Sequence, residues 1–375
     1  MPEELLASHV HSSNEGRVEV LDGWRTLCVT LVIVSHLLEY SNLRLSISPV
    51  AMTYIDQLGR YGVGVFFLIS GFVICRGLLS EERKRVGVSL SGFYVRRSFR
   101  ILPPLLLYVA AISFFSWQGI LPREGAASIW RTMTFTCNIE GANCAGFYGG
   151  HTWSLSIEEQ FYVVFPLLFI FAGRARKVGI FALIALLMVS GKLMSPILEE
   201  EHNILWKFVP ISMGVAAALH EKTLRRWAPK LPGVFVYLAP LAAYSMAFAV
   251  PDHNRSLIFV ISLLLGVAVV LTIVKPSRLS RLLLKPPMLA LGRASYGIYL
   301  WQQLVVAPHP GWNGLVYVCA IAACIGWALL SFRFIEQPLI RIGAGLSQRL
   351  ARPARIAPAT PHPAPQPAVG VAGAG

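Results

Sequence analysis

The sequence has few charged residues, and acidic residues are especially scarce. Only 14% of its 375 residues are charged, with 19 acidic side chains against 33 basic ones. A soluble domain carries about 25% charged residues. Because 55% of this chain is hydrophobic, the composition argues against a soluble protein and indicates one that lies in a membrane.

Other patterns are also missing. The first 20 residues contain Glu3, Glu4, Glu15 and Glu19, so they lack the basic start of a secretory signal peptide. The spacing of the six cysteines does not suggest zinc, and we expect no metal site. The sequence contains no Gly-x-Ser-x-Gly motif, which leaves a serine hydrolase without support.

Long apolar segments recur along the whole chain. A hydrocarbon core ~30 Å thick requires ~20 mostly apolar helical residues. We therefore expect an all-α, polytopic integral membrane protein of about ten transmembrane helices. The expected spans are Trp24–Tyr40, Gly59–Leu79, Ile101–Trp117, Trp153–Ala172, Val178–Ser195, Ile204–His220, Gly233–Val250, Leu257–Val274, Pro287–Val306 and Gly314–Phe334.

The expected membrane topology accounts for the formal net charge of +14. With the N-terminus inside and ten alternating spans, most Lys and Arg residues lie in inside loops, as the positive-inside rule requires. This placement explains the charge without nucleic acid. The outside loops receive only Arg44, Arg60, Arg123, Arg131, Lys192, Lys207 and Arg255.

Three segments are expected: a cytoplasmic N-terminal segment (1–20), a transmembrane domain (21–341) and a disordered cytoplasmic tail (342–375). The last 25 residues are rich in Ala, Pro and Gly and have no apolar period. Cys137 and Cys144 share the long outside loop, and the sequence leaves open whether they form a disulfide. The other cysteines are expected to be small core residues inside helices, at Cys28, Cys75, Cys319 and Cys324.

Polar groups inside a membrane are costly and are therefore functional candidates. Arg25 and His36 are eleven residues apart in the first span, which places them ~16 Å apart on one helix face. His36 is a candidate general base toward a hydroxyl. The alternative is a hydrogen-bonded histidine that packs helices together.

Two further candidates lie at the inner ends of spans. Arg97 and Arg100 share a helix face, and paired guanidinium groups suit phosphate; alternatively they are ordinary positive-inside anchors. Glu336 follows the last span and either pairs with these arginines or is a surface carboxylate. Gly71, with its neighbours Ser70 and Phe72, permits close approach of a ligand or of another helix.

Two carboxylates, Glu158 and Glu159, begin the fourth span within Trp153–Tyr162. Either one could orient His36, because acyl-transfer sites pair a base with an orienting group. The alternative is an aromatic belt with a carboxylate near a helix N-terminus.

Six segments together resemble the acyltransferase 3 family, the bacterial membrane O-acyltransferases. They occur in family order over nearly the whole chain: Leu21-Asp22-Gly23-Trp24-Arg25 with His36, Gly64–Phe72, Arg97-x-x-Arg100-Ile-Leu-Pro103, Trp153–Tyr162, Ser295–Trp301 and Phe334-Ile335-Glu336.

The resemblance implies a bacterial inner-membrane enzyme that transfers an acyl group, usually acetyl, from cytoplasmic acyl-CoA. The acceptor would be a hydroxyl of a carbohydrate, glycolipid or secondary metabolite. Acyl-CoA is then a co-substrate, no cofactor is bound permanently, and membrane lipid is the other partner. In the family the Arg–His pair is regarded as catalytic, which carries over to Arg25 and His36. Likewise Arg97 and Arg100 would bind CoA, while the acyl-CoA channel would be lined by Ser70, Gly71 and Phe72.

One position departs from the family pattern. Relatives often have a histidine after the Tyr-Leu-Trp of the ninth span, whereas this chain has Gln302 and Gln303. The change puts the role of that histidine in doubt here and could mark a different acceptor class. Two other functions stay open: a secondary transporter, which would predict internal repeats, and a non-catalytic scaffold, which would tolerate loss of Arg97 and Arg100.

Overall fold

The computed structural model describes residues 18–41, 47–84, 87–122, 126–139, 144, 146–194, 204–249 and 257–351. Within these ranges the regular elements are all helical, so the expected all-α class is confirmed. Residues 1–17 and 352–375 lie outside the described part of the chain. They make up most of the expected N-terminal segment and most of the expected tail.

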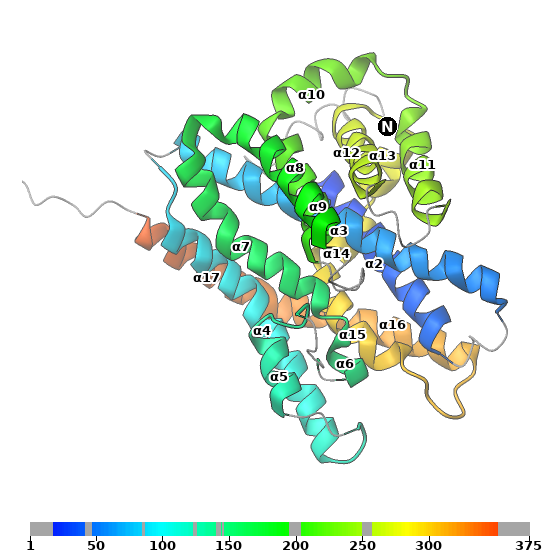
Figure 1. The fold of residues 1–375 in the computed structure, drawn as a ribbon. Helices are drawn as coiled ribbons and strands as arrows, with labels where there is room; N and C mark the ends of the chain where they lie inside the picture. Colours follow the sequence, from blue (N-terminus) through cyan, green and yellow to red (C-terminus); the bar gives the residue numbers. More distant parts are fainter. Residues whose placement is uncertain are drawn as a thin grey trace, which may run out of the picture.

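The helices follow one another with short connections (Figure 1). In chain order they are α2 (Val20–Tyr40), α3 (Pro49–Lys84), α4 (Leu90–Trp117), α5 (Ala126–Met133), α6 (Gly146–Gly150), α7 (Trp153–Ala172), η2 (Gly173–Ala175), α8 (Arg176–Met194), α9 (Ile204–Leu219), α10 (Glu221–Trp227), η3 (Ala228–Lys230), α11 (Phe235–Ala249), α12 (Ile258–Val274), α13 (Arg278–Leu283), α14 (Pro286–Arg293), α15 (Ser295–Val306), α16 (Gly314–Ser331), the π-helical turn η5 (Phe332–Glu336) and α17 (Gln337–Leu350).

Each expected span coincides with helical residues, but the count of ten spans is not confirmed. The helices α9, α11 and α12 are apolar yet shorter than the ~20 residues that a membrane crossing requires. The ninth expected span is broken at Ala294 into α14 and α15. Five helical runs in the described residues are long and apolar enough to cross: Val20–Tyr40, Pro49–Lys84, Leu90–Trp117, Gly146–Met194 and Gly314–Leu350.

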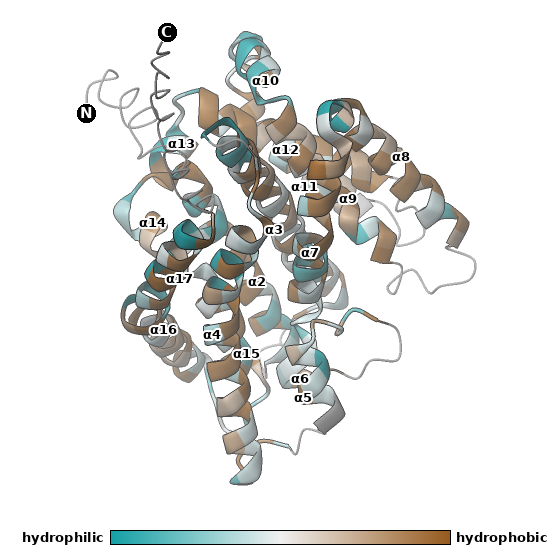
Figure 2. Cartoon of the chain, turned by 90° about the vertical axis from the view of Figure 1, so that its left-hand side faces the viewer, coloured by the Kyte–Doolittle hydropathy of each residue, from teal (hydrophilic) through white to brown (hydrophobic). Residues whose placement is uncertain are grey.

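The outer surface of the bundle is apolar. Phe171 on α7 is 84% exposed and Val178 on α8 is 75% exposed, and hydrophobic residues run along most of α8 in Figure 2. Large apolar side chains exposed in this number are unusual on a soluble monomer. They support a protein whose surface faces lipid.

The core is built around α3, which packs against α2 on one side and α9 on the other. Gly71 on α3 and Gly214 on α9 allow this contact, because a Cβ at Gly71 would overlap the carbonyl oxygen of Ile211. Phe72 is 1% exposed within the same packed region. Gly71 and Phe72 therefore fill space between helices and do not line the cavity described below; their place along an acyl-CoA channel stays a prediction.

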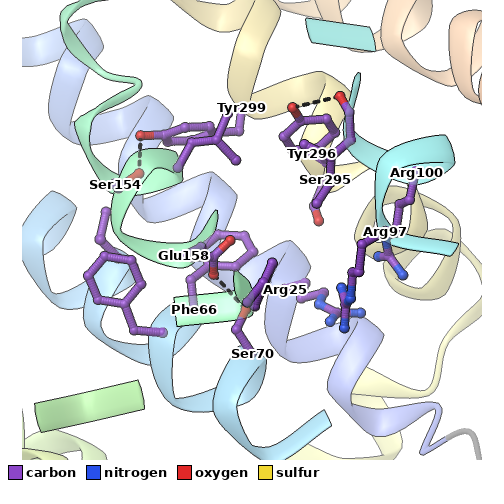
Figure 3. A pocket seen from close by; sticks show the side chains of 15 residues that line it. Arg25, Phe66, Ser70, Arg97, Arg100, Ser154, Glu158, Ser295, Tyr296 and Tyr299 are labelled. Carbon is purple, nitrogen blue, oxygen red and sulfur yellow. Dashed lines mark hydrogen bonds between the residues drawn. The ribbon is translucent and has the colours of Figure 1, made fainter. Parts of the chain in front are cut away.

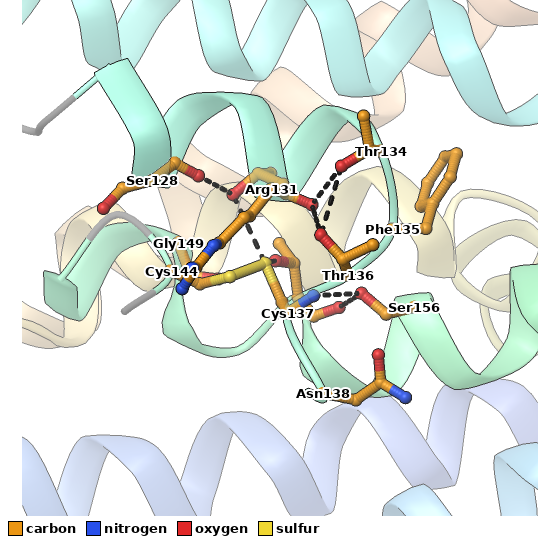
Figure 4. The surroundings of a disulfide bond; sticks show 12 residues. Ser128, Arg131, Thr134, Phe135, Thr136, Cys137, Asn138, Cys144, Gly149 and Ser156 are labelled. Atoms are coloured by element: carbon orange, nitrogen blue, oxygen red, sulfur yellow. Dashed lines mark hydrogen bonds between the residues drawn. A yellow bond between two sulfur atoms is a disulfide. The ribbon is translucent and has the colours of Figure 1, made fainter. Parts of the chain in front are cut away.

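A disulfide joins Cys137 to Cys144 in the segment between α5 and α7 (Figure 4). The segment is attached to α7, because the backbone N–H of Cys137 donates to Ser156 Oγ at 3.2 Å. The side-chain amides of Asn138 and Gln160 also exchange two hydrogen bonds of 2.9 Å. We call this part of the bundle, with α5 and α6, the disulfide end; α10 and α13 lie at the opposite end in Figure 2.

The unpaired cysteines are Cys28, Cys75, Cys319 and Cys324, and the first two and Cys324 are buried core residues as expected. Cys319 differs, since it is exposed on the outer face of α16.

The expected tail begins too early at residue 342. Helix α17 continues to Leu350 and packs along α4, where Arg96 donates to Ser347 Oγ and Gly343 lies against the ring of Phe99. Residues 342–350 are therefore helical, and the face of α17 that packs on α4 carries the small buried residues Gly343 and Ser347.

Candidate functional site

A cavity of about 80 Å³ lies among α2, α3, α4, α7 and α15 (Figure 3). It brings together residues that are far apart in the sequence, including five of the predicted site residues. Its polar lining residues are Arg25, Ser70, Arg97, Arg100, Ser154, Glu158, Tyr162, Ser295, Tyr296 and Tyr299, and its apolar ones are Val63, Phe66, Phe67, Ile101 and Leu155.

Arg25 enters the cavity from the first turns of α2. Its guanidinium lies 3.4 Å from the carboxylate of Asp22, one turn earlier. Asp22 is 2% exposed and also faces the guanidinium of Arg293 on α14 at 3.8 Å. Asp22 therefore links α2 to α14 and restricts the position of Arg25 at the cavity wall.

Arg97 and Arg100 lie one turn apart on α4, and both face the cavity. The guanidinium of Arg97 lies 4.6 Å from the ring centroid of Tyr162 on α7 and 5.8 Å from that of Phe93. Such stacking holds a planar guanidinium in one orientation. Arg96 points elsewhere, since it pairs with Glu81 at 2.7 Å.

Glu158 is the acidic residue that lines the cavity. It accepts a hydrogen bond of 2.5 Å from Ser70 Oγ on α3 (Figure 3), and it lies within electrostatic reach of Arg25, Arg97 and Arg100. The next residue, Glu159, interacts with Arg97, and its buried Oε1 has no hydrogen-bond partner among the described residues.

Glu336 ends the π-helical turn η5 beside this site. It is 3% exposed, so the alternative of a surface carboxylate is excluded. Ser331 Oγ donates to it at 3.5 Å, and Glu336 interacts with Arg100. The expected association of Glu336 with the arginine pair is thereby supported for Arg100.

His36 does not line the cavity. It lies near the other end of α2, about 16 Å along the helix axis from Arg25, and its Nδ1 faces the side-chain amide of Gln302 on α15, with Nε2 of Gln302 at 3.0 Å. The expected contact between His36 and Glu158 or Glu159 is therefore wrong for the described residues. The reason is that Glu158 lies near Arg25 at the start of α2, whereas His36 lies near the end of the same helix.

Gln302 begins a chain of hydrogen bonds that crosses three helices. Its Nε2 is 3.2 Å from Oε1 of Gln303, and Nε2 of Gln303 donates to the backbone carbonyl of Phe147 in α6 at 3.0 Å. Both glutamines are buried, at 1% and 3% exposure. Two residues that departed from the family pattern thus contact or support the predicted base.

No individual role was predicted for the residues between the cavity and His36, although Tyr299 belongs to the Ser295–Trp301 segment. Tyr299 lines the cavity, lies 2.7 Å from Ser154 Oγ and donates to the backbone carbonyl of His151 at 2.6 Å. His151 lies two residues before the Trp153–Tyr162 segment. The neighbouring motif was the available signal for His151, but the motif begins only at Trp153.

The arrangement suits an anionic ligand. Three guanidinium groups converge on one cavity, and each can donate paired hydrogen bonds to phosphate. Among the described residues, no group of three His, Cys, Asp or Glu side chains could hold a metal ion. The fold and the site thus define a helical membrane protein with a cationic cavity and a separate buried histidine.

Comparison with known proteins gives the family. The chain belongs to the acyltransferase 3 family, since the model described as an acyltransferase domain matches residues 18–333. Nodulation protein 10 of Rhizobium leguminosarum bv. viciae is 27% identical over 392 aligned positions, which cover 91% of this chain and 98% of that protein. No solved structure matches significantly.

Two further relatives are longer. The putative peptidoglycan O-acetyltransferase YrhL of Bacillus subtilis (strain 168) is 26% identical over 85% of this chain and 54% of that protein. The peptidoglycan O-acetyltransferase OatA of Listeria monocytogenes is 26% identical over 87% of this chain and 56% of that protein. The chain thus spans about half the length of these two relatives.

Proposed function

We propose that this protein is a membrane O-acyltransferase that takes an acyl group, with acetyl as the default, from cytoplasmic acyl-CoA. The acceptor is a hydroxyl of a carbohydrate, glycolipid or secondary metabolite. The observation that carries the proposal is the convergence of Arg25, Arg97 and Arg100 on one cavity in a chain of the acyltransferase 3 family.

The arginines provide the donor site. Coenzyme A carries phosphates at one end and its thioester at the other, so a donor requires a cationic site and a reaction site some distance apart. Arg97 and Arg100 bind phosphate oxygens, with Arg25 completing the cationic wall. Glu336 interacts with Arg100 and restricts its position. The Ser70 hydroxyl donates a hydrogen bond to Glu158 and so helps to position that carboxylate.

His36 is the general base. In this mechanism Nδ1 of His36 carries the ring proton and donates it to Oε1 of Gln302, 3.4 Å away, so the unprotonated Nε2 takes the proton of the acceptor hydroxyl. The acceptor oxygen attacks the thioester carbonyl, the new C–O bond forms, and the C–S bond breaks. The CoA thiolate leaves and takes up the proton held by His36, so the histidine returns to its neutral form.

The glutamates organise the donor site in this mechanism. Glu158 neutralises part of the charge of three arginines and keeps their side chains from repelling one another when no donor is bound. Glu159 does the same for Arg97. Both glutamates therefore act by positioning the arginines and not by orienting His36.

The membrane orientation follows from the same scheme. The protein lies in a bacterial inner membrane with both termini in the cytoplasm, which places the arginine cavity near the side where CoA is made. The basic loops support this orientation, and so does the disulfide at the other end of the bundle, because disulfides persist on the oxidising side.

A carbohydrate is the favoured acceptor, since the names of two relatives specify peptidoglycan. The test uses purified protein in proteoliposomes with acetyl-labelled acetyl-CoA and three acceptors: an N-acetylglucosamine oligosaccharide, peptidoglycan glycan strands and octyl glucoside. We expect label in covalent linkage to an acceptor. Uptake of an acceptor without acetyl-CoA would instead indicate the transporter, and neither transfer nor uptake would indicate the scaffold.

A further inference from the structure

His151 is a buried histidine to which the proposed mechanism gives no role. It lies in the turn before α7 and is 5% exposed. Neither ring nitrogen has a hydrogen-bond partner among the described residues; the backbone of Leu300 is nearby but outside hydrogen-bond geometry. Buried polar side-chain atoms are normally paired, and an exception requires an explanation.

The surroundings of His151 resemble a ligand site more than an apolar core. Its ring packs against Tyr299 at a centroid distance of 5.2 Å and edge-on against Tyr108 at 5.7 Å. Trp301 also packs on Tyr108 at 5.5 Å, and its buried indole nitrogen likewise has no partner in the described chain. Unpaired donors and acceptors thus gather among aromatic rings.

This aromatic group lies between the two halves of the proposed reaction. On one side Tyr299 forms part of the arginine cavity wall. On the other, His151 is within electrostatic reach of His36, whose own ring packs near Tyr40 and Gln302. His151 thus lies on the same face of α15, that of Tyr299 and Gln302, as the groups that a substrate would meet at His36.

We propose that His151 binds the acceptor: its imidazole forms hydrogen bonds with a sugar hydroxyl next to the reacting one and so positions the acceptor at His36. A neutral imidazole offers one N–H donor and one nitrogen acceptor, and a hydroxyl group can pair with either of them. The flanking Tyr and Trp rings supply apolar faces of the kind that cover a sugar ring. The proposal rests on the proposed function and names its acceptor class as a polyhydroxylated ring.

The test compares two substitutions that separate hydrogen bonding from packing. His151→Phe keeps an aromatic ring and removes both nitrogens, whereas His151→Gln keeps a donor and an acceptor without the ring. We expect His151→Phe to lower kcat/KM for the best acceptor of the panel by about 10- to 100-fold. His151→Gln should stay within about tenfold of the unmodified protein.

Acetyl-CoA binding is measured in parallel, and rates are expressed per acetyl-CoA site so that poorly folded protein does not count. The affinity for acetyl-CoA should be unchanged in both variants. His220→Phe and His220→Gln are matched controls, since His220 interacts with Lys177 and Phe181 far from α15. Both should transfer at the unmodified rate.

Three results would overturn the assignment of His151. They are unchanged acceptor kinetics in His151→Phe, a His151→Phe variant more active than His151→Gln, or equal loss of acetyl-CoA binding and transfer in both variants. The last two would indicate a packing role. Failure of the proposed function looks different: no acceptor is acetylated by the unmodified protein, or His36→Ala stays fully active.

Discussion

The donor site can be tested through Arg97 and its neighbour Arg96. Both belong to the same turn of α4, but Arg97 faces the cavity and stacks at 4.6 Å on Tyr162, while Arg96 pairs with Glu81 and Ser347. Arg97→Ala removes a guanidinium from the cavity. Arg96→Ala removes the same charge from the same helix but leaves the cavity wall intact.

The expected magnitude follows from the hydrogen bonds lost. A hydrogen bond to a charged group contributes about 1.5–3 kcal/mol, so Arg97→Ala should weaken acetyl-CoA binding by about 10- to 100-fold. Arg97→Lys keeps the charge but loses the paired donors and the planar stack on Tyr162. Its affinity for acetyl-CoA should therefore lie between that of Arg97→Ala and that of the unmodified protein. Arg96→Ala should bind acetyl-CoA within about twofold of the unmodified protein.

Isothermal titration calorimetry in detergent at two salt concentrations measures these affinities. Thermal unfolding of each variant shows whether the fold is kept, because Arg96→Ala also removes a contact between α4 and α17. Equal weakening by Arg96→Ala and Arg97→Ala would refute the reasoning. It would mean that the general positive charge of this surface, and not the cavity, attracts the donor.

Three other changes give further predictions. Gln302→Leu removes the partner of His36 and should lower kcat by about tenfold or more with acetyl-CoA affinity unchanged; an unchanged kcat in steady-state assays would count against this role. Cys137→Ser opens the disulfide and should cost about 2–3 kcal/mol of stability, seen as a lower thermal midpoint that reducing agent no longer shifts. Gly71→Ala should lower the midpoint through overlap with Ile211, whereas Gly64→Ala, which meets nothing within 4 Å, should not.

The sequence predicted the helices well because apolar runs of this length have few alternatives. It also placed Arg97 and Arg100 correctly, since their spacing of three residues defines a shared face. The breaks were harder to find. The interruption at Ala294 and the continuation of α17 to Leu350 depend on packing against α2 and α4, which local composition does not encode.

The candidate site was predicted as a set of residues but not as an arrangement. Arg25 and Glu158 do line one cavity, yet Glu158 contacts Ser70 and not His36. Depth in the membrane was the missing information: a residue's place along its own helix did not reveal which residue of another helix lies level with it. Gln302 illustrates this, because it contacts His36 across 266 positions of sequence.

The central claim is that His36 acts as the base in acyl transfer from acyl-CoA. The most direct measurement is CoA release by purified protein given acetyl-CoA and the acceptor panel, beside His36→Ala, with acetyl-CoA binding measured on both proteins. We predict acceptor-dependent release that disappears in His36→Ala while acetyl-CoA still binds to both. Full release by His36→Ala, or no acetyl-CoA binding by the unmodified protein, would contradict the account.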